Sequence, residues 1–294
     1  MSIPVTRIMT KSVIYFSLPG NREQIRETMQ KSKKTTFPVV DENKKVVGII
    51  SHSDLFTKPK ENQLSLLMAR NPKTIKSDRT VLECAEAMYE HELSRLPVID
   101  ENSNELIGIV SISDIVSKVL ITKKYAEASI AAYKEHIATI WKETPADVAQ
   151  NILRLSGQKA LPVLDHMGLV GIVSMNDLFK LVKVRESSSQ SSTGGGEGES
   201  GSWDSETVFV VVDRELVLPS IPISEVIVSK ERMQVAYKHN TLQELAQKCR
   251  KCSIDQLPLI SSEGRLMGLI TNRDLLRSFI IYEREKEEVK ESFT

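Results

Sequence analysis

The chain has 294 residues, and its 39 Lys and Arg residues balance 39 Asp and Glu residues, so the formal net charge at pH 7 is zero. This length suits two compact units of about 100 to 150 residues each. The balanced charge gives no global electrostatic reason to bind nucleic acid or an anionic membrane. The first ten residues lack the apolar core of a signal peptide, and no window approaches the roughly 18 apolar residues of a membrane span, so we expect a soluble, cytoplasmic protein.

A heptad of glycine, two aliphatic residues, a hydroxyl residue, two variable positions and aspartate occurs four times. The copies span 48–54, 108–114, 171–177 and 268–274. The pattern predicts a short buried strand that ends at the hydroxyl residue, followed by a helix with the aspartate in its first turn.

A second landmark precedes each heptad: an apolar residue, a proline and a short apolar run. The prolines are Pro38, Pro97, Pro162 and Pro258, and they lie 16, 17, 15 and 16 residues before the heptad aspartates. Such self-similarity marks a repeated supersecondary unit. Helical spacing of apolar residues before each proline, with a short strand expected ahead of it such as 13–16 or 74–76, predicts the order β-α-β-β-α and an α/β (α+β) fold class.

The spacing divides the chain into four repeats. We expect repeat 1 at 1–60, repeat 2 at 61–122, repeat 3 with a preceding linker helix at 123–185, and repeat 4 at 207–294. The Ser-, Gly- and Glu-rich stretch 186–206 cannot bury apolar surface, so we expect it to be flexible. A strand is predicted at 207–212, and the charged segment 282–290 is typical of an exposed helix end.

Three cysteines do not suggest a disulfide framework. Cys249 and Cys252 form a C-x-x-C pair, but a zinc site of four cysteines needs a second pair, which the chain lacks. Cys249 also occupies the position of Met29, Met88 and Leu153 in the other repeats. We therefore expect a buried, small apolar side chain there and no metal site.

The heptad has two interpretations. Ser51-x-x-Asp54 has the form of a helix capping box, which is worth about 1 kcal/mol without any ligand. Capping boxes prefer Glu or Gln, however, and all four copies carry Asp. A helix N-terminus attracts phosphate, and a fixed carboxylate can accept ribose hydroxyls. The heptad is therefore also a reasonable nucleotide site.

The proline run followed by Gly-x-x-[Ser/Thr]-x-x-Asp resembles the cystathionine-β-synthase (CBS) domain, and the whole chain resembles four such domains in tandem. The resemblance implies two Bateman modules, each a pair of CBS domains with clefts for adenosyl ligands, which stack as a pseudo-symmetric disc. With this arrangement, the chain would be similar to the γ subunit of AMP-activated protein kinase and to stand-alone archaeal proteins. The implied ribose-binding aspartates are Asp54, Asp114, Asp177 and Asp274, with Ser51, Ser111, Ser174 and Thr271 beside ribose or phosphate.

Phosphate recognition is expected to differ among the repeats. Two residues before the prolines stand Thr36, Arg95, Ala160 and Gln256, so only Arg95 supplies a cation there. In the family, a basic residue just before Leu-Pro binds phosphate. Lys159 and Arg273 are further candidates, while Thr36, Pro38 and Pro97 are expected to line the nucleotide site. Asp255 departs from the phosphate-binding pattern, which argues against full occupancy of all four sites.

No catalytic constellation emerges, because the five histidines recur at no common repeat position and the chain lacks a Walker loop. We expect a regulatory protein rather than an enzyme: a sensor of AMP, ADP, ATP or a related adenosyl ligand such as S-adenosylmethionine, with no other cofactor. Its expected partners are that ligand and a regulated protein or a second copy of the chain. The alternative is a ligand-free interaction scaffold in which the heptads are only caps.

Overall fold

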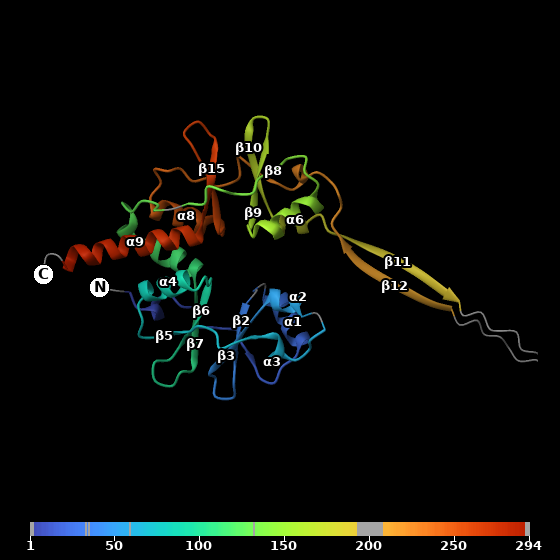
Figure 1. Cartoon of the computed structure of the whole chain (residues 1–294), viewed down its shortest axis with the longest axis horizontal. Coiled ribbons are helices and arrows are strands. Elements are labelled where there is room, and N and C mark those ends of the chain that lie inside the picture. The colour runs from blue at the N-terminus through green and yellow to red at the C-terminus, as the bar shows by residue number, and fades with distance from the viewer. Residues whose placement is uncertain are drawn as a thin grey trace, which may run out of the picture. The chain divides into compact units, whose positions relative to one another are not determined.

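The computed structural model (Figure 1) describes residues 3–32, 34, 36–58, 60–131, 133–192 and 208–291. The chain divides into two compact units. The first holds repeats 1 and 2 with most of repeat 4, and the second holds repeat 3, the segment up to Val235 and the hairpin turn of repeat 4. Each repeat contributes its own small sheet with helices, which confirms the predicted α/β class.

Repeat 1 is a β-hairpin with helices packed on one face. Its elements are β1 (Phe16–Ser17), α1 (Arg22–Ser32), β2 (Thr36–Val40), β3 (Val46–Ser51) and α2 (His52–Thr57). Strands β2 and β3 are antiparallel, and β1 joins β2 in parallel. Phe37 and Ile50 oppose each other in the hairpin, and both are buried in one cluster with Ile25 and Met29 of α1. The alternation of strand side chains thus fixes which face meets the helices.

Repeat 2 has the same plan. Its elements are β5 (Ile75–Lys76), α4 (Val81–Glu90), β6 (Arg95–Ile99), β7 (Leu106–Ser111) and α5 (Ile112–Ile115), continued by the π-helical turn η2 (Val116–Leu120). Thr80 and Glu83 form a capping box that starts α4. Leu96 and Val110 are the buried hairpin pair that corresponds to Phe37 and Ile50.

Repeat 3 forms the body of the second unit. Its elements are β8 (Ile140–Trp141), α6 (Ala146–Ser156), β9 (Ala160–Asp165), β10 (Gly168–Ser174) and α7 (Met175–Phe179). Leu161 and Val173 are its buried hairpin pair, and they cluster with Ala149 and Leu153 of α6.

Repeat 4 contains α8 (Leu242–Cys252), β14 (Gln256–Ile260), β15 (Leu266–Thr271) and the long helix α9 (Asn272–Glu291). The predicted first strand of this repeat is reduced to a parallel bridge between Ala236 and Leu259. Helix α9 includes the charged segment predicted to be helical, and it packs against α4 of repeat 2 through a hydrogen bond from Arg284 Nε to Glu86 Oε1 of 2.6 Å.

Segments that precede one repeat pair with the hairpin of another. The strand β4 (Ala69–Arg70), which leads into repeat 2, pairs with β3 of repeat 1. In return, Thr10, which precedes the first strand of repeat 1, bridges to Ile109 of repeat 2. Strand β13 (Val228–Ser229) pairs with β10 in the same way, and Lys134 bridges to Leu269. We call the residues around Thr10, Ala69, Lys134 and Val228 the exchanged segments.

The heptad glycine is the residue that each exchanged segment approaches. A Cβ atom on Gly171 would lie 2.6 Å from the Val228 carbonyl oxygen, and one on Gly268 would lie 2.4 Å from that of Lys134. At Gly48 and Gly108 the nearest atom would be a methionine Sδ, of Met68 and Met9. Glycine is therefore required at Gly171 and Gly268 for the close approach of a second backbone, whereas at Gly48 and Gly108 it makes room for a flexible methionine side chain.

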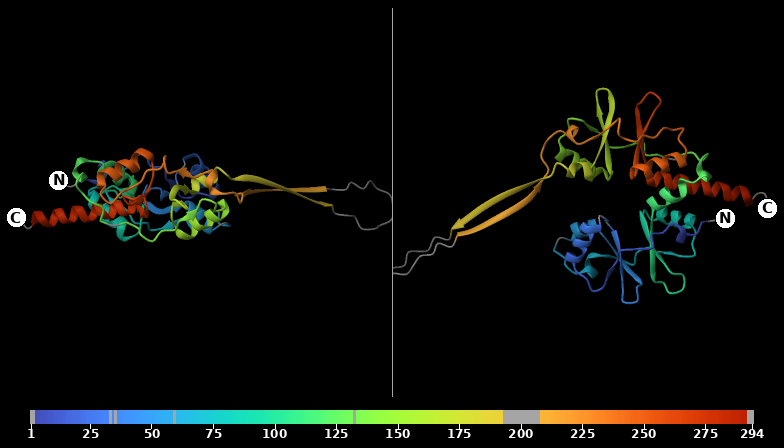
Figure 2. Two further views of the ribbon diagram at one scale, coloured as in Figure 1. Left: turned by 90° about the horizontal axis from the view of Figure 1, so that it is seen from above. Right: turned by 180° about the vertical axis from the view of Figure 1, so that it is seen from behind.

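Two predicted segments differ from the structure. The expected linker helix is only the 3₁₀ turn η3 (Lys123–Tyr125), followed by non-helical backbone in the described residues up to 135. This backbone bonds elsewhere: the Ala128 carbonyl accepts from Leu242 N, and Lys134 pairs with Leu269. Residues 186–192, expected to be flexible, belong to strand β11 (Lys183–Ser192), which pairs over its whole length with β12 (Val208–Val217) (Figure 2).

The strand predicted at 207–212 is confirmed from Val208 onward as β12. A β-branched strand needs a hydrogen-bonding partner, and β11 supplies it. The rest of the predicted flexible stretch, 193–206, lies outside the described residues.

Candidate functional site

Each heptad forms a strand-to-helix corner in which the aspartate and the hydroxyl residue are hydrogen-bonded. In repeat 2, the Ser111 amide and Oγ both donate to Asp114 Oδ2, at 2.9 and 2.5 Å. The hydroxyl-to-Oδ2 distances in the other repeats are 2.5 Å for Ser51–Asp54, 2.6 Å for Ser174–Asp177 and 2.6 Å for Thr271–Asp274. These contacts are those of a helix capping box. The capping box occupies one carboxylate oxygen, Oδ2, of each aspartate.

The second carboxylate oxygen, Oδ1, distinguishes the four corners. Asp114 Oδ1 accepts from Lys118 Nζ at 2.6 Å, and Asp177 Oδ1 accepts from Lys180 Nζ at 2.7 Å. Within the described part of the chain, Oδ1 of Asp54 and of Asp274 has no hydrogen-bond partner. These two corners keep an acceptor that a ribose hydroxyl can use.

The carboxyl of Asp177 is held in its charged form. Burial opposes ionisation, but hydrogen bonds from Lys180 and Ser174 outweigh it and lower the pKa of Asp177 below its ordinary value of 3.8. This corner therefore stays anionic at neutral pH.

Strand pairing places the residue that precedes the Phe/Leu-Pro pair opposite the heptad hydroxyl. The pairs are Thr36 with Ser51, Arg95 with Ser111, and Ala160 with Ser174. Pro38 and Pro97 pair in the same hairpins with Ile49 and Ile109. Phe37 and Leu96, which alternate with these residues along the strands, are buried in the cores. The side chains of Thr36, Arg95 and the two prolines therefore lie on the opposite face of each sheet.

Arg95 fits an anionic ligand. Its Nε is buried and has no hydrogen-bond partner in the described structure. A buried, charged donor without an acceptor is costly, and a phosphate oxygen would satisfy it. The residues present at the corner of repeat 2 therefore suit a phosphate beside the Ser111 hydroxyl.

The other two candidate cations have different surroundings. Lys159 is exposed and lines a cavity of about 400 Å³ together with Ser174 and Met175. Arg273 is directed to repeat 2: it donates to the Tyr89 carbonyl at 3.1 Å, and its guanidinium lies 5.5 Å from the Tyr89 ring centre. The Arg273 side chain is therefore bound to repeat 2 and not to the corner at Asp274 in its own repeat.

Sequence reasoning missed a polar contact between the corners of repeats 2 and 4. Asn272 Nδ2 donates to Asp255 Oδ1 at 2.8 Å, and Ser113 Oγ donates to the same oxygen at 3.3 Å. Asp255, which departs from the phosphate-binding pattern, thus accepts hydrogen bonds from both repeats. Lys118 and Lys180 were missed as well, although a lysine three or four residues after an aspartate is a recognisable helical ion-pair signal.

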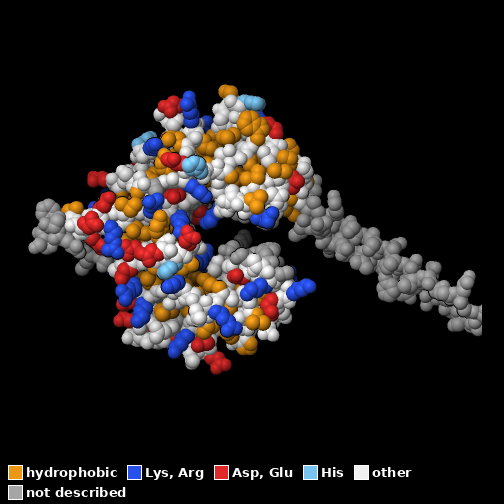
Figure 3. Space-filling view, in the orientation of Figure 1, with side chains coloured by type: hydrophobic (Ala, Val, Ile, Leu, Met, Phe, Trp, Pro, Cys, Tyr) orange, Lys and Arg blue, Asp and Glu red, His pale blue; other side chains and the backbone are white. Residues whose placement is uncertain are grey.

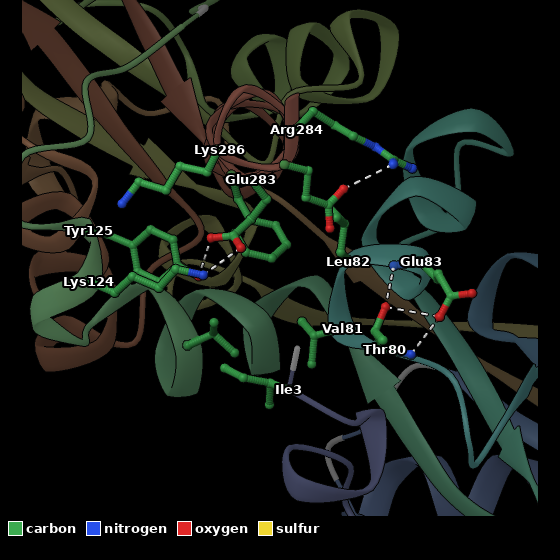
Figure 4. A pocket seen from close by; sticks show the side chains of 13 residues that line it. Ile3, Thr80, Val81, Leu82, Glu83, Lys124, Tyr125, Glu283, Arg284 and Lys286 are labelled. Carbon is green, nitrogen blue, oxygen red and sulfur yellow. Dashed lines mark hydrogen bonds and ion pairs between the residues drawn. The ribbon is translucent and has the colours of Figure 1, made fainter. Parts of the chain in front are cut away.

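A second cavity, of about 380 Å³, lies where α4, α9 and η3 meet (Figure 4). Several of its charged groups are paired with one another. Glu283 accepts from Lys124 Nζ at 2.5 Å and from the Tyr125 hydroxyl at 2.9 Å, and Arg284 donates to Glu287 at 3.1 Å. Since cations and carboxylates balance there, this cavity has no charge preference for a nucleotide.

The charged side chains of the described residues bear on whether the protein has further binding sites. On the face drawn in Figure 3, basic and acidic side chains are interspersed. Among the described residues, no group of three or more His, Cys, Asp or Glu residues could hold a metal ion. Cys249 is buried, as predicted, and burial raises the pKa of its thiol to about 12.

No helix within the described ranges is long and apolar enough to cross a lipid bilayer.

Comparison with protein families agrees with the repeat structure. The model of the CBS domain matches four times, at residues 5–61, 64–121, 130–184 and 219–280. The chain belongs to the CBS-domain family. The four heptads are thus the strand-to-helix corners of four CBS domains, as the resemblance in the sequence implied.

Two solved structures share this architecture over 94% of the chain. A conserved protein from Pyrococcus horikoshii is 30% identical, with a TM-score of 0.69 over 94% of this chain and 99% of that one. Protein MJ1225 from Methanocaldococcus jannaschii, described as a candidate archaeal homologue of γ-AMPK, has the same fold at 20% identity, with a TM-score of 0.64 over 94% of this chain and 100% of that one.

Sequence comparison finds MJ1225 at 25% identity over 275 residues, or 86% of this chain and 90% of that protein. Protein MJ0188 from the same organism is 30% identical over 138 residues, which span 46% of this chain and only 51% of that relative.

Proposed function

We propose that this CBS protein is a non-catalytic sensor that binds AMP, ADP, ATP or a related adenosyl ligand at its strand-to-helix corners. One observation carries the proposal: each heptad aspartate uses Oδ2 for the cap, while Asp54 and Asp274 keep Oδ1 for a ribose hydroxyl. A carboxylate fixed in this way can accept hydroxyl groups without first losing other partners.

Arg95 supports the phosphate part of the proposal. Its unsatisfied, buried Nε lies on the strand next to Ser111. A phosphate there would gain a charge-assisted hydrogen bond. We therefore propose that a phosphorylated ligand is held best at the corner of repeat 2, and that ribose alone is held at Asp54 and Asp274.

Ligand binding would act through the exchanged segments. The corners of repeats 1 and 2 lie at the ends of strands whose neighbours come from the other repeat. A ligand can shift the pairing of two repeats only by its differential affinity for the two arrangements. We propose that such a shift regulates a protein partner in the cytoplasm, and that AMP-to-ATP ratio is the signal.

The experiment is calorimetric titration of the full chain with AMP, ADP, ATP and S-adenosylmethionine, repeated on Asp54→Glu and Asp274→Glu. A glutamate preserves a capping box but displaces the carboxylate, so stability should stay the same while binding at the altered corner is lost. The matched control is Glu83→Asp, which alters the capping box of α4 at no corner. Absence of binding by all four compounds would instead favour the ligand-free scaffold.

A further inference from the structure

In three of the four repeats, the residue four positions after the heptad aspartate hydrogen-bonds to an exchanged segment. Lys58 Nζ donates to the Leu66 carbonyl at 2.6 Å, and Lys118 Nζ donates to the Ile8 carbonyl at 2.5 Å. In repeat 4, Ser278 Oγ accepts from the Ala131 amide at 3.0 Å. In repeat 3 the position is Leu181, which packs against the same buried cluster as Ile227. In repeats 1, 2 and 4, this position therefore links the corner by a hydrogen bond to a segment that comes from elsewhere in the chain.

Lys118 differs from its counterparts because it also binds the heptad aspartate. Its Nζ lies 2.6 Å from Asp114 Oδ1, so one ammonium joins the carboxylate to the Ile8 carbonyl, 110 residues away. Lys58 makes no ion pair with Asp54 in the described structure. Lys180 pairs with Asp177, but its side chain is 64% exposed, against 41% for Lys118.

Two anchors make the Lys118 contact more persistent than an ordinary surface ion pair. A lone lysine loses side-chain entropy when it holds one exposed carboxylate. The Asp114 side chain is only 16% exposed, and the Ile8 carbonyl fixes the ammonium from the other side. The carboxylate oxygen Oδ1, which remains available at Asp54 and Asp274, is therefore occupied by the Lys118 ammonium at Asp114.

Building on the proposed function, we propose that Lys118 is a specificity-determining residue that closes the corner of repeat 2 to ribose. A ligand must displace the ammonium from Asp114 Oδ1 before a ribose hydroxyl can bind there. Displacement also weakens the link between the corner and Ile8, so occupancy of this corner loosens the exchanged segment at Thr10. The corners at Asp54 and Asp274 fill without this competition.

The probe is adenosine, which carries ribose and no phosphate, titrated into the full chain by calorimetry. Lys118→Met keeps the aliphatic stem and removes the ammonium. Removing an ion pair of this kind should tighten adenosine binding at one site by about two- to five-fold. Lys58→Met is the matched control, because it removes the corresponding contact to an exchanged segment without touching a heptad aspartate, and its adenosine affinity should equal that of the wild type.

A double variant and a second readout locate the effect. Lys118→Met combined with Asp114→Ala should lose the gain, since the two residues act on the same oxygen. Amide hydrogen exchange at Thr10, whose N–H donates to the Ile109 carbonyl at 2.9 Å, should quicken when AMP saturates the wild type. It should not respond to AMP in Lys118→Met.

The outcomes separate the two proposals. If the wild type binds adenosine and Lys118→Met binds it no more tightly, the role of Lys118 is wrong while the sensor function stands. If neither protein binds any adenosyl compound, both proposals fail.

Discussion

The exchanged segments predict that the heptad glycines are not equivalent. In Gly171→Ala, the new Cβ would meet the backbone oxygen of Val228 at 2.6 Å and Ile227 Cδ1 at 3.2 Å. Backbone cannot rotate aside as a side chain can, so β13 has to move away from β10. The adjacent hydrogen bond from Lys230 N to the Val170 carbonyl, 2.9 Å long, would weaken. Overpacking of this kind costs about 1–3 kcal/mol.

Gly108→Ala is the matched control. There the new Cβ would meet Met9 Sδ at 2.5 Å and Cγ at 3.0 Å, and a methionine side chain adapts to such a change. We expect its cost to stay below about 1 kcal/mol. The assay is urea unfolding followed by circular dichroism and, in a Trp203→Phe background, by the fluorescence of Trp141 in repeat 3. The reasoning is refuted if Gly171→Ala unfolds like the wild type, or if Gly108→Ala loses as much stability.

Three further predictions concern single side chains. Arg95→Met should weaken AMP binding about ten-fold, because it removes a charge-assisted contact to phosphate. Calorimetry should show unchanged adenosine binding, and equal losses of affinity for both ligands would contradict a phosphate role. Because the pKa of Asp177 is lowered, its charged form stabilises the fold above pH 3.8, and this contribution is lost as the pH falls through the folded-state value. Asp177→Asn should therefore lose less stability than the wild type between pH 5 and pH 3 in thermal unfolding, and parallel pH profiles would contradict this. At pH 8, iodoacetamide should label the exposed Cys252 before Cys84 and Cys249, because burial raises the thiol pKa values of these two residues to about 12. Mass spectrometry of the labelled native protein checks this order, and rapid labelling of all three thiols would contradict a closed core.

The repeat pattern was sufficient to predict the four hairpins and the corner at each aspartate. Proline, glycine and the hydroxyl residue recur at nearly constant spacing, and a strand's alternation then determines which side chains are buried. The predicted cap between Ser111 and Asp114 follows from local geometry alone, because its two residues are three positions apart.

Long-range pairing could not be predicted in this way. Nothing local to Gly171 reveals that Val228 approaches it, and residues 123–135 have helical spacing although their backbone bonds to repeat 4. The same holds for 186–192: their composition suggests a flexible chain, yet β12 provides a pairing partner. The stacking of Bateman modules into a disc remains a prediction.

The differences among the four corners were only partly visible in the sequence. Arg95 was recognisable as a cation beside Leu-Pro, whereas the engagement of Arg273 with Tyr89 depends on the packing of α9 on α4. The available oxygen of Asp54 and the occupied one of Asp114 differ only because Lys58 and Lys118 adopt different contacts.

The most direct test of the ligand-binding claim is a crystal structure of the full chain grown with saturating AMP. We predict density for a ribose within hydrogen-bond distance of Asp54 Oδ1 or Asp274 Oδ1, and for a phosphate at Arg95 Nε. Crystals that show no nucleotide at any of the four aspartates, with AMP and with ATP or S-adenosylmethionine in its place, would contradict the account.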